Sequence, residues 1–142
     1  MKTLRYLLVA ALLASGFSIP APATAVTARS SARQVSYVIS YEPAFGLPHM
    51  PYVGWLQLKI DSSGIINGTY RGLSITPDDP FVNRITPVTG GVSGNTIHFD
   101  IGMGISPFSF NGQIQGNWIE GTAIWRGQIY RVTGEIGRPR GM

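Results

Sequence analysis

FSFNGQIQGNWIEGTAIWRGQIYRVTGEI, residues Phe108–Ile136, alternates apolar or small residues with polar ones through three consecutive segments. Phe108, Phe110 and Gly112 fall on one side of this alternation, and amide or hydroxyl side chains fill the positions between them. Because successive side chains of a β-strand point to opposite faces, a period of two indicates strands with one buried face. The joins between the segments are short and polar, so the stretch predicts an antiparallel meander of three strands.

The same alternation continues toward the N-terminus. Segments rich in β-branched and aromatic residues, or alternating in the same way, predict further strands at Gln34–Tyr41, Gly54–Asp61, Ile65–Arg71 and Thr96–Ile101. The turn Ser62-Ser63-Gly64 joins two of them into a hairpin. Glu42–Pro51 carries three prolines and a glycine, so it is expected to be a long loop with apolar content.

Residues 72–92 are less regular. Short strands are expected at Leu73–Thr76 and Phe81–Thr86, with a turn at residues 77–80 and a break at Gly90-Gly91. After Glu42 the longest run free of Gly and Pro is nine residues, 55–63, whereas an average helix needs ~11–12. The chain is therefore expected to be all-β, with about eight short strands and no substantial helix.

Glycines recur within the expected strands, as in Ile66-Asn67-Gly68 and Ile119-Glu120-Gly121. Glycine permits the bends by which a meander curls shut, and closure removes the exposed edges of an open sheet. We therefore expect a small closed antiparallel barrel in preference to a sandwich. The expected outer faces carry charged and amide side chains, such as Lys59, Asp100 and Gln113, which favours a soluble barrel over an outer-membrane one.

The N-terminus has the pattern of an export signal. Lys2 and Arg5 precede an apolar run, and Ala23-Thr24-Ala25 matches a small-residue cleavage site. We expect residues 1–25 to be a secretory signal peptide, 26–33 a flexible basic leader, 34–137 the barrel and 138–142 a disordered tail. The chain has no cysteine, so the expected location is a bacterial periplasm or exterior, without a disulfide framework and without a membrane span after cleavage.

The formal charge of +4 is concentrated at the ends of the chain. Without Lys2 and Arg5, nine basic side chains accompany seven acidic ones, and between Gln34 and Gly137 five basic side chains accompany the same seven. A nucleic-acid-binding protein concentrates positive charge on its folded face. This distribution therefore argues against nucleic acid as a partner.

Several short segments resemble the avidin/streptavidin family of secreted eight-stranded meander barrels that bind biotin. The likeness lies in Gly54-Trp55, in the turn and strand Gly64–Tyr70, in Phe110-Asn111-Gly112-Gln113 and in the segment that ends at Trp125. Lipocalin-like barrels share such Gly-rich hairpins. The resemblance implies the architecture.

The residues that hold biotin in that family are not matched. Leu56, Gln57 and Leu58 follow Trp55, where the family carries an Asn and a Ser that hold the ureido group. Phe108 and Phe110 stand where the family has Ser or Thr and Trp. Tyr70 and Trp125 match in type.

Aromatic residues dominate the expected inner face. An eight-stranded barrel is either filled by its own side chains or holds one small ligand, and the sequence leaves both possibilities open. In the second case Tyr70 and Tyr130 would supply polar tips at one end, capped by the loop that carries Phe45, His49 and Met50. The candidate ligand-binding residues are Phe45, Tyr52, Tyr70, Phe108, Phe110, Trp125 and Tyr130.

Other chemistry finds little support in the sequence. His49 and His98 are expected on a loop and an outer face, and a metal site needs three or four converging ligands. Asp78-Asp79, flanked by prolines, is better explained by turn chemistry than by calcium binding. No nucleophile–base motif stands out, so neither an enzyme nor a cofactor is expected.

Two functions therefore remain open. The first is an exported binding module that takes a small apolar or aromatic ligand in the barrel mouth. The second is an exported protein-interaction or inhibitor domain that contacts an extracellular protein through its loops and has no ligand cavity.

Overall fold

A computed structural model describes residues 31–47, 50–75, 78–102 and 105–140. The described residues form eight strands in chain order: β1 (Arg33–Pro43), β2 (Tyr52–Ile60), β3 (Ile65–Gly72), β4 (Ile85–Ser93), β5 (Thr96–Ile101), β6 (Phe108–Gln115), β7 (Trp118–Trp125) and β8 (Gln128–Ile136). The expected signal peptide and all but three residues of the expected leader lie outside these ranges. Among the described residues, no helix has the length and hydropathy needed to cross a bilayer.

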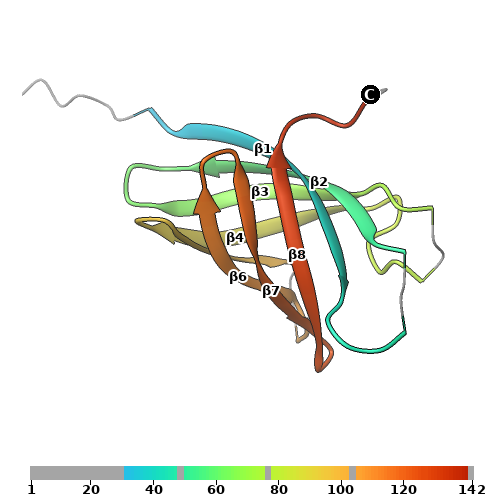
Figure 1. The fold of residues 1–142 in the computed structure, drawn as a ribbon. Helices are drawn as coiled ribbons and strands as arrows, with labels where there is room; N and C mark the ends of the chain where they lie inside the picture. Colours follow the sequence, from blue (N-terminus) through green and yellow to red (C-terminus); the bar gives the residue numbers. More distant parts are fainter. Residues whose placement is uncertain (1–30, 48–49, 76–77, 103–104, 141–142) are drawn as a thin grey trace, which may run out of the picture.

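The sheet closes on itself. Each strand pairs antiparallel with the next, and β1 also pairs with β8 from Tyr37 opposite Ile136 to Pro43 opposite Tyr130. Figure 1 shows β1 and β8 crossing the same side of the barrel. The predicted all-β, antiparallel, eight-stranded meander barrel is confirmed.

One face of every strand lines the interior. Side chains alternate between buried and exposed along the strands, as the sequence pattern predicts, and Phe99 stacks on Phe110 with ring centroids 4.6 Å apart. The buried apolar residues of the strands are Val35, Tyr37, Ile39, Tyr41, Tyr52, Leu56, Leu58, Ile66, Tyr70, Val88, Ile97, Phe99, Ile101, Phe108, Phe110, Ile119, Ala123, Tyr130 and Val132. These side chains form one continuous core along the barrel.

The two ends of the barrel differ. The β1–β2, β3–β4 and β5–β6 connections and the β7–β8 hairpin all lie at one end, which we call the mouth. The other end, the far end, holds three tight turns together with the start of β1 and the end of β8. In the far-end turn after β2, the Asp61 carboxylate accepts hydrogen bonds from the Ser63 hydroxyl and from the Ser63 and Ile65 amides, which lower its pKa.

Four expectations about the strands are wrong. The first strand continues through Glu42 and Pro43, because Pro43 pairs with Tyr130 at the strand's last position. The described part of Leu73–Thr76 is not a strand, and β4 begins only at Ile85 rather than at Phe81. The expected break at Gly90-Gly91 is absent, because β3 and β5 pair with both glycines and keep β4 continuous.

Gly54 makes room for a large neighbour. A Cβ built at this position would overlap the terminal ring atoms and hydroxyl of Tyr70, which is itself fully buried. The Tyr70 ring is fixed on its other side by Phe81, with ring centroids 5.3 Å apart. The inward Tyr70 side chain therefore depends on the absence of a side chain at position 54.

Replacing Gly54 with Ala is expected to lower the free energy of unfolding by about 2 kcal/mol, since overpacking a filled core costs about 1–3 kcal/mol. Urea unfolding followed by tryptophan fluorescence measures the change. Gly137→Ala is the matched control, because nothing lies within 4 Å of a Cβ at that position. A Gly54→Ala variant as stable as the control would contradict the packing described here.

Candidate ligand site at the barrel mouth

Aromatic side chains from four strands meet inside the mouth. Tyr41 of β1 lies at the centre, and its ring centroid is 5.1 Å from Tyr52 of β2, 4.9 Å from Phe108 of β6 and 5.9 Å from Tyr130 of β8. All four residues occupy inward positions near the mouth ends of their strands. We call these four residues, together with Tyr70 of β3, the mouth cluster.

The β3–β4 connection enters the mouth from outside the sheet. Asp79 and Phe81 are 2% and 7% exposed, and the Phe81 ring packs edge-on against Tyr70 and Phe108, with centroids 5.3 and 5.9 Å apart. Val82 forms an isolated bridge with Gly72, which fixes this segment beside the end of β3. Residues Asp79, Pro80 and Phe81, here called the plug, therefore fill the space above the mouth cluster.

Asp79 is held by one of its two carboxylate oxygens. Its Oδ1 accepts hydrogen bonds from the Tyr41 hydroxyl, at 2.9 Å, and from the Phe81 amide, at 2.8 Å. Among the described residues, its Oδ2 is buried without a hydrogen-bond partner. Since buried polar atoms in folded proteins nearly always find partners, this oxygen marks an incompletely satisfied site.

The hydroxyls of the mouth cluster stay protonated. Burial raises the pKa of Tyr41, and the neighbouring Tyr70 and Asp79 raise it further. Burial, followed by the hydrogen bond to the Asp78 carboxylate, raises the pKa of Tyr52 to about 12. Burial likewise raises the pKa of Tyr70 and of Tyr130. These tyrosines are therefore neutral hydrogen-bond donors at physiological pH.

Tyr70 carries the second unsatisfied polar atom of the mouth. Its hydroxyl is fully buried and lies near the Tyr41 hydroxyl, but it makes no hydrogen bond of good geometry in the described part of the chain. The mouth thus combines aromatic walls, a spare hydroxyl and an unpaired carboxylate oxygen.

The structure distributes the seven residues predicted from the sequence over four places. Tyr52, Tyr70, Phe108 and Tyr130 belong to the mouth cluster. Phe110 lies deeper, against Phe99. Trp125 is partly buried at the start of the β7–β8 turn, where the Arg126 guanidinium lies 4.7 Å from its ring centroid. Phe45 is 79% exposed on the β1–β2 connection, away from the cluster.

The plug was not predicted from the sequence. The loop with Phe45, His49 and Met50 was expected to cap the mouth, but Phe45 and Met50 are exposed, and His49 lies outside the described residues. Tyr41 was also omitted, although the alternation of Tyr37, Ile39 and Tyr41 in the first strand was a signal that it faces inward. No local pattern placed Asp79 or Phe81 in the mouth.

The described residues were also compared with the requirements of a metal site. Within the described ranges, no three His, Asp or Glu side chains come together in a way that could hold a metal ion. His98 is exposed on β5, and Asp78 accepts the hydrogen bond of Tyr52.

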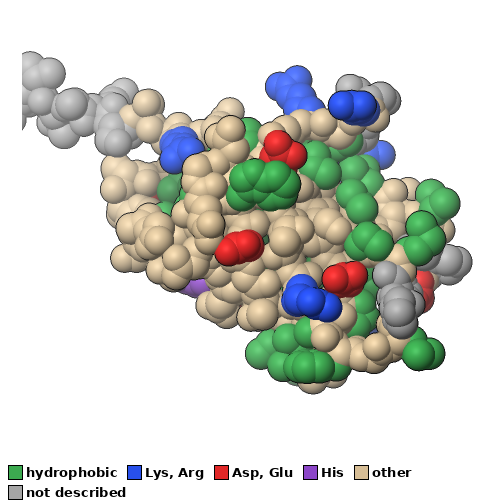
Figure 2. All heavy atoms as spheres, in the orientation of Figure 1, with side chains coloured by type: hydrophobic (Ala, Val, Ile, Leu, Met, Phe, Trp, Pro, Cys, Tyr) green, Lys and Arg blue, Asp and Glu red, His purple; other side chains and the backbone are tan. Residues whose placement is uncertain are grey.

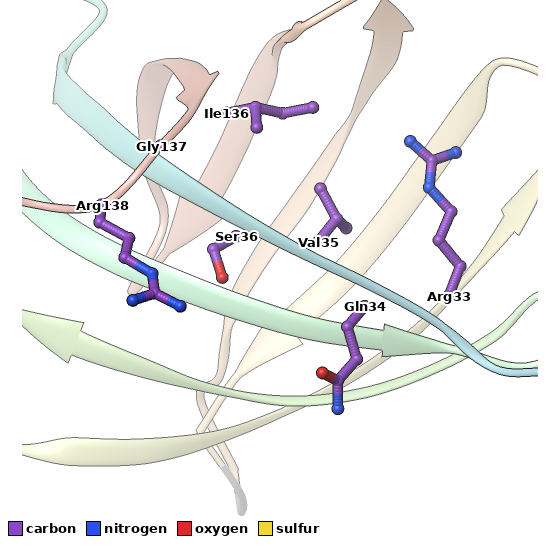
Figure 3. A pocket seen from close by; sticks show the side chains of 7 residues that line it. All are labelled: Arg33, Gln34, Val35, Ser36, Ile136, Gly137 and Arg138. Atoms are coloured by element: carbon purple, nitrogen blue, oxygen red, sulfur yellow. The ribbon is translucent and has the colours of Figure 1, made fainter.

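A hollow at the far end offers a less suitable site. It lies between the start of β1 and the residues that follow β8, and it is lined by Arg33, Gln34, Val35, Ser36, Ile136, Gly137 and Arg138. Figure 3 shows the guanidinium groups of Arg33 and Arg138 at opposite ends of this hollow. The two guanidinium groups do not converge on one anion.

Comparisons with known proteins give a structural likeness only. No protein-family model and no curated protein matches the chain. The crystal structure of a rhizavidin–biotin complex matches with a TM-score of 0.46 and 19% identity, over 70% of this chain and 99% of that chain. A second crystal structure, of rhizavidin, matches with a TM-score of 0.47 and 17% identity, over 80% of this chain and 89% of that chain. At this identity the likeness concerns the avidin-like fold alone.

The raised pKa values of the mouth tyrosines predict alkaline instability. Unfolded tyrosines ionise near pH 10, whereas Tyr52 in the folded protein ionises near pH 12. Their contribution to stability is complete below about pH 10 and is lost as pH rises further, at about 1.4 kcal/mol per pH unit for each tyrosine. Urea unfolding at pH 8 to 11 should therefore give a free energy that is level at first and falls above pH 10.

The Tyr41→Phe variant serves as the control for this assignment, because it removes one of the titrating hydroxyls. It should be less stable at pH 8, since Asp79 loses a hydrogen bond, and its stability should fall less steeply above pH 10. Equal slopes for the two proteins would show that Tyr41 is not one of the groups responsible.

Proposed function

We propose that the protein is a binding module that takes one small molecule in the mouth of its barrel, in the place of the plug. The observation that carries the proposal is the contact between the mouth cluster and the plug, where Asp79 Oδ2 and the Tyr70 hydroxyl are buried without a hydrogen bond of good geometry to any described residue. Burying a polar atom without a partner costs about 1–3 kcal/mol. The plug is thus an imperfect occupant that a better-matched molecule can displace.

The plug also indicates the chemistry of the ligand. The mouth holds an aromatic ring, that of Phe81, against Tyr70 and Phe108, and it holds an anionic oxygen of Asp79 through the Tyr41 hydroxyl. A ligand that replaces both groups needs a small aromatic or apolar body and a hydrogen-bond acceptor such as a carboxylate. The spare Tyr70 hydroxyl can donate a second hydrogen bond to that acceptor.

We further propose that the barrel acts outside the cytoplasm as a binding protein rather than an enzyme. The export signal expected at residues 1–25 supports this location. The neutral, hydrogen-bonding tyrosines of the mouth support binding, since their raised pKa values disfavour the ionised form that a catalytic base would require.

Shortening the plug should expose the site. In the double variant Asp79→Ala/Phe81→Ala, we expect anilinonaphthalene sulfonate, an aromatic anion, to bind at least about tenfold more tightly than to the unaltered protein. The reason is that the unaltered protein must first expel its plug, which lowers apparent affinity by the fraction of open molecules. Fluorescence titration measures the affinity, and biotin and aromatic carboxylates can then be tested as competitors.

Two controls separate mouth binding from loosened packing. Phe45→Ala removes an exposed aromatic ring of the mouth-end loops and should leave dye affinity unchanged. Adding Tyr41→Phe to the double variant should weaken dye binding about tenfold, since a hydrogen bond to a charged group contributes about 1.5–3 kcal/mol. Near-UV circular dichroism must retain the native signal, because molten states also bind this dye. If Tyr41→Phe leaves the dye affinity of the double variant unchanged, the result would favour the second hypothesis, contact with an extracellular protein through the loops.

A further inference from the structure

Large apolar side chains project from every connection at the mouth end. Phe45 and Leu47 on the β1–β2 connection are 79% and 91% exposed, Ile75 on the β3–β4 connection is 96% exposed, and Ile105 on the β5–β6 connection is fully exposed. Ile124 and Ile129, cross-strand partners beside the β7–β8 turn, are 54% and 39% exposed. We call these six residues the apolar rim.

The far end exposes fewer large apolar side chains, those of Ile65, Trp118 and Ile136, which lie at strand ends. Its three tight turns themselves are polar and carry Asp61-Ser62-Ser63-Gly64, Ser93-Gly94-Asn95 and Gly116-Asn117. Figure 2 shows hydrophobic side chains along the lower and right-hand margins of the molecule, over the mouth-end connections of Figure 1. Soluble proteins expose single apolar residues routinely, but their gathering on all four connections of one end marks an interaction surface.

Basic side chains accompany the rim. Arg84, just before β4, and Arg126, in the β7–β8 turn, are both exposed at the mouth end, as is Asp78 on the β3–β4 connection. A third acid of this end, Glu42 at the end of β1, lies 3.8 Å from the Arg131 guanidinium. The Arg126 guanidinium lies over the Trp125 ring, 4.7 Å from its centroid. Tryptophan and arginine in this arrangement suit the boundary between lipid headgroups and acyl chains, where an amphipathic ring and a cation are both satisfied.

We propose that the apolar rim docks the mouth of the barrel on an anionic phospholipid surface, with the rim side chains in the acyl boundary and Arg84 and Arg126 among the headgroups. The rim is spread over separate protruding connections, so that its side chains stand apart as individual tips. A bilayer accepts such tips one by one, whereas a protein partner would need a matching set of separate pockets. The two arginines favour an anionic surface over a neutral one. The proposal does not depend on the nature of any ligand in the mouth.

Two tryptophans report which end meets the lipid. Trp125 lies at the rim and Trp118 at the opposite end of β7, roughly 23 Å away at ~3.3 Å per residue. Because the chain has three tryptophans, Trp55→Phe/Trp118→Phe leaves Trp125 as the reporter, and Trp55→Phe/Trp125→Phe leaves Trp118. Each full-length variant is mixed with phosphatidylglycerol vesicles that contain brominated lipid.

Bromine should quench the Trp125 reporter and leave the Trp118 reporter unchanged. This comparison isolates the rim from the apolar N-terminal run of the same chain, which both variants share. In the Trp125 background, Leu47→Asp/Ile105→Asp should weaken quenching and vesicle binding at least about tenfold, as the burial of two large apolar side chains is lost. The matched far-end control, Ile65→Asp, replaces another exposed isoleucine and should change binding less than twofold.

Salt and lipid charge complete the test. Raising ionic strength from 0.1 to 0.5 M, or replacing phosphatidylglycerol with phosphatidylcholine, should weaken quenching of Trp125 several-fold, because both changes remove attraction to the arginines. Equal quenching of the two reporters, or quenching of neither, would overturn the proposal. Dimers that Leu47→Asp/Ile105→Asp converts to monomers, without any quenching of Trp125, would instead identify the rim as an interface between two copies of this chain.

Discussion

Pairing between β1 and β8 is the constraint on which the rest of the structure depends. It joins the first strand to the last, so that each strand has two neighbours and the inward side chains share one enclosed interior. The width of that interior is fixed by the number of strands, which leaves room for packed side chains and little more. The position of Tyr41 follows from this closure, because its strand lies between β2, which carries Tyr52, and β8, which carries Tyr130.

The mouth combines tightly packed aromatic rings with a buried carboxylate. Aromatic rings provide most of the buried surface there, and ring contacts of 5–6 Å hold the plug in place. The plug nevertheless brings a carboxylate into the same space, and that carboxylate is satisfied on one oxygen alone. The satisfied oxygen, Oδ1, has a structural part, because it accepts hydrogen bonds from the buried Tyr41 hydroxyl and from the Phe81 amide.

Most of the fold could be predicted from the sequence, because a strand with one buried face shows an apolar or small residue at every second position. Phe108, Phe110 and Tyr130 were placed on the inner face by that periodicity alone. The errors fall where periodicity ends. Nothing local distinguishes an Asp79 that faces solvent in a proline-flanked turn from an Asp79 hydrogen-bonded to Tyr41, 38 residues away in the chain. The prediction that Phe45 caps the mouth was wrong for a related reason. In a loop there is no periodicity to show whether an aromatic side chain packs on the barrel or faces solvent.

The chain enters and leaves the barrel at the same place. Arg33 begins β1 at the far end, Ile136 ends β8 there, and the Gly137 amide donates a hydrogen bond to the Ser36 carbonyl at 3.0 Å. A domain, label or immobilising tag joined directly before Arg33 or directly after Gly137 would consequently be carried on the side opposite the mouth. If the barrel is attached to a surface at its far end, the mouth therefore faces away from that surface.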